Sequence, residues 1–238
     1  MTADVWKRPD VAIGFLDERS VMIPDRRRQL DVLLRLLRAA PRPPRRILDL
    51  GTGDGLLLAT ALGAFPEAVG VGLDFSPPML ERARVRLQPF GDRATIVESD
   101  LANPAWLQLV TGPFDAVISG FAIHHLIHER KRALYTEIFN LLNDGGTFVN
   151  CEHVASVSPR VERFFDEVMS EHLYERRRER GEDVTFEQVF QEFLTRPDRA
   201  ANILLQVEVQ CGWLREIGFR DVDCYWKLFE LAIFGGVR

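Results

Sequence analysis

Short apolar runs alternate with segments of helical period through the middle of the chain. The apolar runs lie at 46–50, 69–73, 94–98, 114–119 and 147–154, and helical periods fill 54–64, 77–87 and 128–142. Strands separated by helix-length segments predict a parallel sheet with helices on both faces. An α/β domain is therefore expected over this part of the chain.

The pattern differs at the two ends of the chain. Before the alternation, leucines at helical spacing follow Pro24, and a proline-rich stretch at 41–44 ends that helix. After residue 154 the periods predict helices at 159–180, 184–195 and 199–217, and the tail indicates an antiparallel strand pair. We expect one domain, made of an N-terminal helical arm (1–45), a core (46–154), a helical insertion (155–205) and a last helix with the terminal strand pair (206–238).

Composition narrows the class of protein without naming a function. Of the 238 residues, 46% are hydrophobic and 27% are charged, as in ordinary globular proteins. A formal charge of −5 argues against a strongly basic nucleic-acid binder. The three cysteines lack metal-ligand spacing, so no metal site is expected. The chain begins without a signal-peptide core and has no apolar run of membrane-spanning length, so we expect a cytoplasmic protein without a membrane segment.

The segment ILDLGTGDG, residues 47–55, carries the most chemical information. It brings Gly51 and Gly53 into a tight loop between a strand and a helix, where a ligand can lie against bare backbone. A dinucleotide fingerprint needs a sixth-position glycine where Leu56 stands, and no phosphate-loop lysine follows. The acidic residues Asp49 and Asp54 favour an ammonium or sulfonium group rather than a pyrophosphate.

Two further carboxylates follow the next two predicted strands. Asp74, at the end of the second strand, can accept both hydroxyls of a ribose. Asp100, after the third strand, can accept from an adenine amino group. Together with the acidic glycine loop, they indicate a nucleoside site at one edge of the sheet.

These segments resemble the class I S-adenosylmethionine-dependent methyltransferases. The same likeness is carried by four stretches of the chain: VGVGLD, VESD, FDAVISGFAIHHL and LLNDGGTFVN. The resemblance covers about residues 46–154 and the terminal strand pair. It implies a Rossmann-like, seven-stranded, mostly parallel sheet of order 3-2-1-4-5-7-6 whose last strand is antiparallel. It also implies S-adenosyl-L-methionine as cofactor and S-adenosyl-L-homocysteine as product.

The resemblance assigns cofactor roles to ten positions of this chain. Four would face the methionine portion: Asp49, Gly51, Thr52 and Gly53. Four would surround the nucleoside, with Asp74 on the ribose, Phe75 and Met79 against the sugar or adenine, and Asp100 at the adenine edge. The Leu101 backbone would also bind adenine, and Ser119 would line the floor near the sulfonium.

The acceptor is expected beyond the fourth strand, because ligands of open α/β sheets bind where the strand order reverses. His124 and His125 are the candidate catalytic bases there, although one can instead pack against or cap the next helix. Phe121 lies in the same loop. Glu152 and His153, at the end of the fifth strand, form a second polar cluster on this rim or simply a solvated strand end.

The insertion and the arm offer apolar faces. Phe164, Phe165, Val168 and Met169 share one helix face, which either packs on the domain or forms a lid over the acceptor pocket. The resemblance implies that an N-terminal arm closes over the cofactor, here through four apolar residues: Phe15, Leu16, Met22 and Ile23.

The leading hypothesis is an S-adenosylmethionine-dependent methyltransferase that acts on an oxygen or nitrogen of a small-molecule acceptor. No [DNS]PP[YF] signature follows the fourth strand, and no Lys–Asp–Lys–Glu tetrad stands at the strand ends. Both absences disfavour methylation of DNA adenine, protein glutamine and RNA 2′-hydroxyls. The alternatives are a tRNA-modifying methyltransferase and a non-catalytic protein that binds the cofactor. The acceptor and the oligomeric state stay open.

Overall fold

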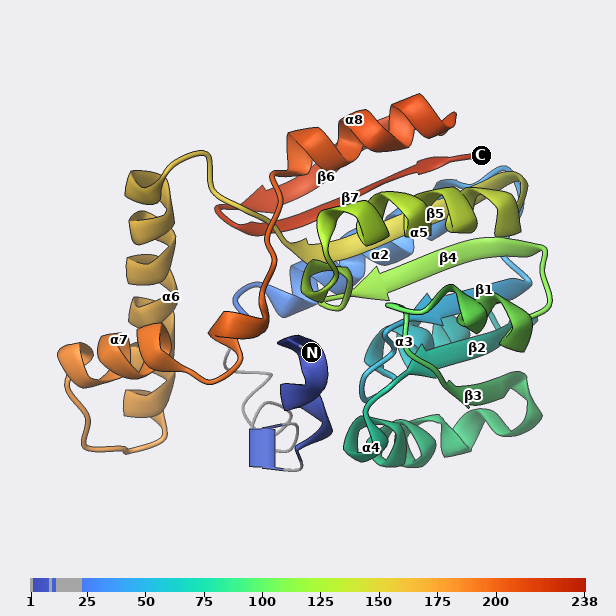
Figure 1. Ribbon diagram of the computed structural model, residues 1–238. Coiled ribbons are helices and arrows are strands. Elements are labelled where there is room, and N and C mark those ends of the chain that lie inside the picture. The colour runs from blue at the N-terminus through green and yellow to red at the C-terminus, as the bar shows by residue number, and fades with distance from the viewer. Residues whose placement is uncertain (1, 9, 12–22) are drawn as a thin grey trace.

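The computed structural model describes residues 2–8, 10–11 and 23–238. Within these residues the centre of the molecule is one seven-stranded sheet of order β3-β2-β1-β4-β5-β7-β6 (Figure 1). The strands are β1 Arg46–Leu50, β2 Val69–Asp74, β3 Ala94–Glu98, β4 Phe114–Gly120, β5 Leu142–His153, β6 Arg220–Leu228 and β7 Leu231–Val237. β7 pairs antiparallel with both β5 and β6, and the other pairs are parallel. The predicted Rossmann-like topology is confirmed.

Alternate residues of each central strand enter two different apolar layers. Ile47 faces a cluster formed with helices α2 Arg26–Ala39, α3 Leu56–Ala64 and α4 Pro77–Leu87. Leu48 and Leu50 face the opposite cluster, formed with α5 His128–Leu141, α8 Val207–Ile217 and the short helix η3 Pro104–Leu109. Burial on both faces explains why these strands are short continuous apolar runs.

The structure corrects two predicted boundaries. β5 begins at Leu142, five residues before the strand predicted at 147–154, and its first residues lie next to a register shift opposite β4. The helix predicted at 199–217 is two pieces, η5 Arg199–Ala201 and α8, joined by a non-helical segment. This linker is held by main-chain bonds instead: Ile203 N–H donates to the His124 carbonyl (2.9 Å), and the Leu205 carbonyl accepts from Ala155 N–H (3.1 Å).

The insertion forms a helix pair beside the sheet, α6 Pro159–Glu179 and α7 Phe186–Thr195 (Figure 1). Its Phe165, Met169 and Phe193 pack against Leu231 of β7. The remaining short helices are η1 Thr2–Lys7, η2 Gln88–Arg93 and η4 Ile123–His125. No helix in the described part of the chain is long and apolar enough to span a bilayer.

Candidate active site

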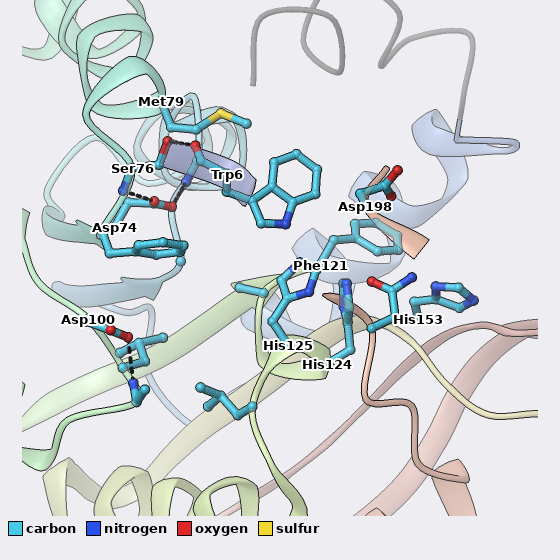
Figure 2. Close-up of a pocket in the computed structure, with 18 of the residues that line it drawn as sticks. Trp6, Asp74, Ser76, Met79, Asp100, Phe121, His124, His125, His153 and Asp198 are labelled. Carbon is cyan, nitrogen blue, oxygen red and sulfur yellow. Dashed lines mark hydrogen bonds between the residues drawn. The ribbon is translucent and has the colours of Figure 1, made fainter. Parts of the chain in front are cut away.

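A cavity of about 450 Å³ opens at the carboxyl ends of the parallel strands. The loops after β1, β2, β3 and β4 line one part of it, and the insertion lines the other. Figure 2 shows Asp74 and Asp100 at one end, and His124, His125 and His153 together with Asp198 at the other. Ile23 of the arm also lines the cavity, whereas Phe15, Leu16 and Met22 lie outside the described residues.

The glycine loop lines the cavity with backbone rather than with its polar side chains. Gly51 and Gly53 both have positive φ, 67° and 55°, and a Cβ on Gly51 would lie 2.1 Å from the Cβ of Ala122. Contrary to expectation, the side chains of Asp49 and Thr52 do not line the cavity. Both are buried, and the Thr52 hydroxyl donates to Asp49 Oδ2 at 2.7 Å, so they support the loop from beneath.

Asp74 is buried at the end of β2 and faces the cavity together with Phe75 and Met79. Its Oδ2 accepts from Gly53 N–H at 2.8 Å and its Oδ1 from Ser76 N–H at 2.9 Å. Burial raises the pKa of Asp74, and these backbone bonds oppose the rise. A carboxylate has about four acceptor positions, so the group keeps capacity for the two hydroxyls of a ribose.

The N-terminal helix η1 covers this end of the cavity. The Ser76 hydroxyl donates to the Trp6 carbonyl at 2.6 Å, and the Lys7 ammonium lies 5.6 Å from the centre of the Phe75 ring. In Figure 2 the Trp6 indole lies between the Asp74 group and Phe121. Sequence reasoning did not place Trp6 at the site, because it lies in a polar stretch without helical period.

The loop after β3, which the resemblance assigns to adenine, lines the same cavity. Asp100 is exposed and accepts from Ala102 N–H at 2.8 Å, while Leu101 is buried beside it. Arg130 of α5 donates from Nε to the Leu101 carbonyl at 2.7 Å, so this carbonyl is already engaged within the protein. Ser119 lies away from the cavity, because its buried hydroxyl donates to the Leu50 carbonyl at 2.7 Å.

His124 and Glu152 form a buried pair at the centre of the rim. The Nδ1 of His124 lies 2.5 Å from Oε1 of Glu152, and His124 lines the cavity while Glu152 lies behind it. Burial lowers the pKa of His124 well below its ordinary value and raises the pKa of Glu152 to about 6. With Nδ1 engaged by the carboxylate, Nε2 is the ring nitrogen that can accept a proton from a ligand.

His125 is held differently from its neighbour. Its Nδ1 lies 3.1 Å from the Ala201 carbonyl, which can only accept, so Nδ1 carries the hydrogen. Burial lowers the pKa of His125 to about 3. This imidazole fastens the end of the insertion to the loop after β4.

Lys131 also joins the end of the insertion to the loop after β4, and the sequence did not single it out. Its buried ammonium donates to the carbonyls of Leu126, at 2.7 Å, and Ile203. A signal was present, because Lys131 precedes Leu134 and Ile138 on the apolar stripe of α5. A lysine in such a stripe must find buried acceptors.

The other end of the cavity, where the acceptor is expected, has apolar walls with a few polar groups. Phe121, Phe165, Met169, Phe193 and Leu231 supply the walls. His153 lines the cavity between them, and its Nε2 lies 2.8 Å from the buried Glu230 carboxylate.

Phe164, predicted to lie in the pocket beside Phe165, does not line it. The structure leaves Phe164 42% exposed, against 3% for Phe165, with the Arg160 guanidinium 5.7 Å from its ring centre. Consecutive helical residues point about 100° apart, so only one of the two reaches the cavity.

Comparison with known proteins places this site in a family. A family model described as a methyltransferase domain matches residues 47–146. A demethylmenaquinone methyltransferase from Clavibacter sepedonicus is 35% identical over 174 residues, which cover 70% of this chain and 67% of that protein. The chain belongs to the class I S-adenosylmethionine-dependent methyltransferases.

More distant relatives extend the likeness to the rest of the chain. A carboxy-S-adenosyl-L-methionine synthase from Nautilia profundicola is 20% identical over 229 residues, 94% of this chain and 91% of that protein. An O-methyltransferase family protein from Burkholderia thailandensis shares the fold with a TM-score of 0.64 at 18% identity. The match covers 89% of this chain and 55% of that longer one.

The residues at the nucleotide end fit S-adenosylmethionine, the cofactor of this family. The bare backbone of Gly51 and Gly53 leaves space that side chains would fill, and Asp74 offers acceptors for ribose hydroxyls. When bound, the cofactor supplies an electrophilic methyl group on a positively charged sulfur. Among the described residues, no group of three or more histidine, cysteine or acidic side chains could hold a metal ion.

Proposed function

We propose that this methyltransferase methylates an oxygen or nitrogen atom of a small-molecule acceptor, with His124 as the base and Glu152 as the residue that orients it. The observation that carries the proposal is the 2.5 Å contact between His124 Nδ1 and Glu152 Oε1 on the rim of the cavity. A carboxylate on one ring nitrogen fixes the tautomer, so that the other nitrogen can take a proton.

The protonation states suit this role near neutral pH. Burial lowers the pKa of His124, which keeps the imidazole neutral and able to accept a proton. With its pKa raised to about 6, Glu152 is ionised above that pH and stabilises the imidazolium that forms. Removal of the acceptor's proton adds to the proximity that the cavity itself provides.

The walls of the acceptor end support a small, largely apolar acceptor. Phe165 and Phe193 of the insertion close over the rim from one side, and Phe121 borders it from the β4 loop. An enclosed apolar site excludes water, which strengthens the electrostatic interactions at the reacting atoms. We therefore propose that the insertion is the lid that shapes the acceptor site.

The test compares the two neighbouring histidines. The variants His124→Ala and His125→Ala are incubated with labelled S-adenosylmethionine and a panel of phenols, carboxylic acids and amines. We expect His124→Ala to lose about 10²–10⁴-fold in rate with cofactor affinity kept, since that is the range for removal of a general base. His125→Ala is the comparison variant: its Nδ1 partner is a neutral carbonyl, which stabilises an imidazolium less than the Glu152 carboxylate does, so we expect a much smaller loss of rate.

Other results would overturn the proposal. A loss of only a few-fold in His124→Ala would leave catalysis to proximity alone. Transfer of label to bulk tRNA, or to no acceptor at all, would support the alternatives of a tRNA-modifying enzyme or a non-catalytic binder.

A second candidate is methylation of a ring carbon in a hydroxylated aromatic compound. It is favoured by the Clavibacter relative, which is named for a demethylated menaquinone, and by the phenylalanine walls of the cavity. The same base would remove the proton of the ring hydroxyl, the adjacent carbon would take the methyl group from the sulfur, and that carbon would then lose its own proton to solvent, which restores the aromatic ring. Nuclear magnetic resonance of the product separates the two candidates, because a methyl on carbon and a methyl on oxygen differ in chemical shift.

A further inference from the structure

A second, smaller cavity of about 280 Å³ lies beside the acceptor end of the first. The two cavities share His153, Arg196 and Asn202, so these three residues form the partition between them. Most other residues around the smaller cavity are polar or charged, in contrast to the apolar walls of the larger one. The acceptor site therefore has a polar far end.

The charges in the wall of the smaller cavity are closely paired. Arg199 lies 2.8 Å from Asp166 and 3.1 Å from Glu162. Glu230 lies 2.8 Å from His153. Apart from Arg196, this wall sets one arginine against three carboxylates, so these groups offer no free cation to an anionic ligand.

Arg196 is paired less closely. Its acidic neighbour Asp198 lies 3.4 Å from Nε, and Nη1 donates to the Phe193 carbonyl at 2.6 Å. Within the described residues, Nη2 donates no hydrogen bond. The guanidinium carbon lies 4.1 Å from the centre of the Phe193 ring, so the ring fixes the plane of the group. An oriented guanidinium with a free edge on a cavity is suited to bind a carboxylate.

The position of Arg196 relates it to the proposed base. Arg196 and His124 both line the larger cavity, so the two groups face a common space. His153 lines the same cavity, with its ring centre 5.8 Å from that of His124 and 5.4 Å from that of Phe165. The proposed base and the partition therefore border the same cavity.

Asn202 adds an independent observation. Its Oδ1 is buried and, among the described residues, has no hydrogen-bond partner. Buried polar groups are normally satisfied, and a rotation of this side chain toward either of the cavities that Asn202 lines would bring the oxygen within reach of a donor on the ligand. A hydroxyl next to the carboxylate would supply that donor.

We infer that Arg196 and Asn202 form the specificity site for an aromatic hydroxy acid, whose carboxylate binds Arg196 and whose neighbouring hydroxyl donates to Asn202. The inference rests on the proposed use of this cavity as the acceptor site. Arg196 binds substrate here and takes no proton, so its effect falls on acceptor affinity.

The test measures binding without turnover. Protein saturated with S-adenosylhomocysteine is titrated calorimetrically with hydroxybenzoic and hydroxynaphthoic acids and with their carboxamides, which have the same shape without the charge. We expect acids to bind at least about tenfold more tightly than amides, since bonds to charged groups are the stronger class. Arg196→Gln should abolish that preference, Arg196→Lys should restore part of it, and the exposed α6 variant Arg163→Gln should keep it.

Three outcomes would overturn the inference: no acid binds, acids and amides bind equally, or Arg196→Gln keeps the preference. If Arg196→Gln weakens S-adenosylhomocysteine as much as the acid, the arginine binds the cofactor's methionine carboxylate instead. Failure here is distinguishable from failure of the proposed function. His124→Ala should keep the acid preference in this assay whatever its turnover shows.

Discussion

Replacement of Asp74 by asparagine tests the nucleotide end of the site with little change in shape. The carboxylate already accepts from Gly53 N–H and Ser76 N–H, at 2.8 and 2.9 Å. An amide keeps one oxygen but turns the other acceptor into a donor. At least one charge-assisted bond to a ribose hydroxyl is then lost, which costs about 1.5–3 kcal/mol, or about 10–150-fold in Kd.

Calorimetric titration with S-adenosylmethionine and S-adenosylhomocysteine measures this loss. Asp92→Asn, an exposed acid in η2, is the matched control and should bind both ligands as the natural protein does. The Kd of Asp100→Asn should lie between those of Asp74→Asn and Asp92→Asn, since Asp100 is exposed and accepts one intrachain hydrogen bond, at 2.8 Å. Thermal melting shows whether each variant is folded. A Kd for Asp74→Asn within threefold of normal, in a protein that melts normally, would refute the placement of the ribose.

Three further variants test the rim, the insertion and the glycine loop. Because burial raises the pKa of Glu152 to about 6, the methylation rate of the wild-type protein should fall as the pH drops through about 6. The pH–rate profile of Glu152→Gln should lack this acidic decrease, and its maximal rate should be lower. Phe165→Ala should raise the KM for the acceptor and Phe164→Ala should leave it unchanged, because only Phe165 lines the cavity. An equal change of the acceptor KM in both variants, measured by steady-state kinetics, would contradict this. Gly51→Ala should lower Tm and cofactor affinity more than Gly53→Ala. Both residues have positive φ, but only a Cβ on residue 51 would meet a neighbour, the Cβ of Ala122 at 2.1 Å. Equal melting temperatures of the two variants would contradict this close approach.

The pattern of the amino-acid sequence predicted the parallel sheet and the residues at one edge of it, while the strand order followed from the resemblance to a known family. Short apolar runs separated by helical periods leave few ways to bury both faces of a strand. The carboxyl ends of parallel strands meet at one edge, so Gly51, Asp74 and Asp100 line one cavity, as predicted from their positions alone. The sequence around a residue is enough to predict its position in the fold where that position follows directly from the strand before it.

Only the tertiary structure decided how the polar groups of the rim are paired. His124 follows β4 and Glu152 ends β5, and the register that sets Gly120 opposite Cys151 brings the two together. The sequence placed both on the rim without joining them. It also missed Arg196, whose contact with the cavity depends on how the insertion packs against β7. Periodicity reports which face of an element is apolar, whereas a side-chain pair depends on the register and packing of elements far apart in the chain.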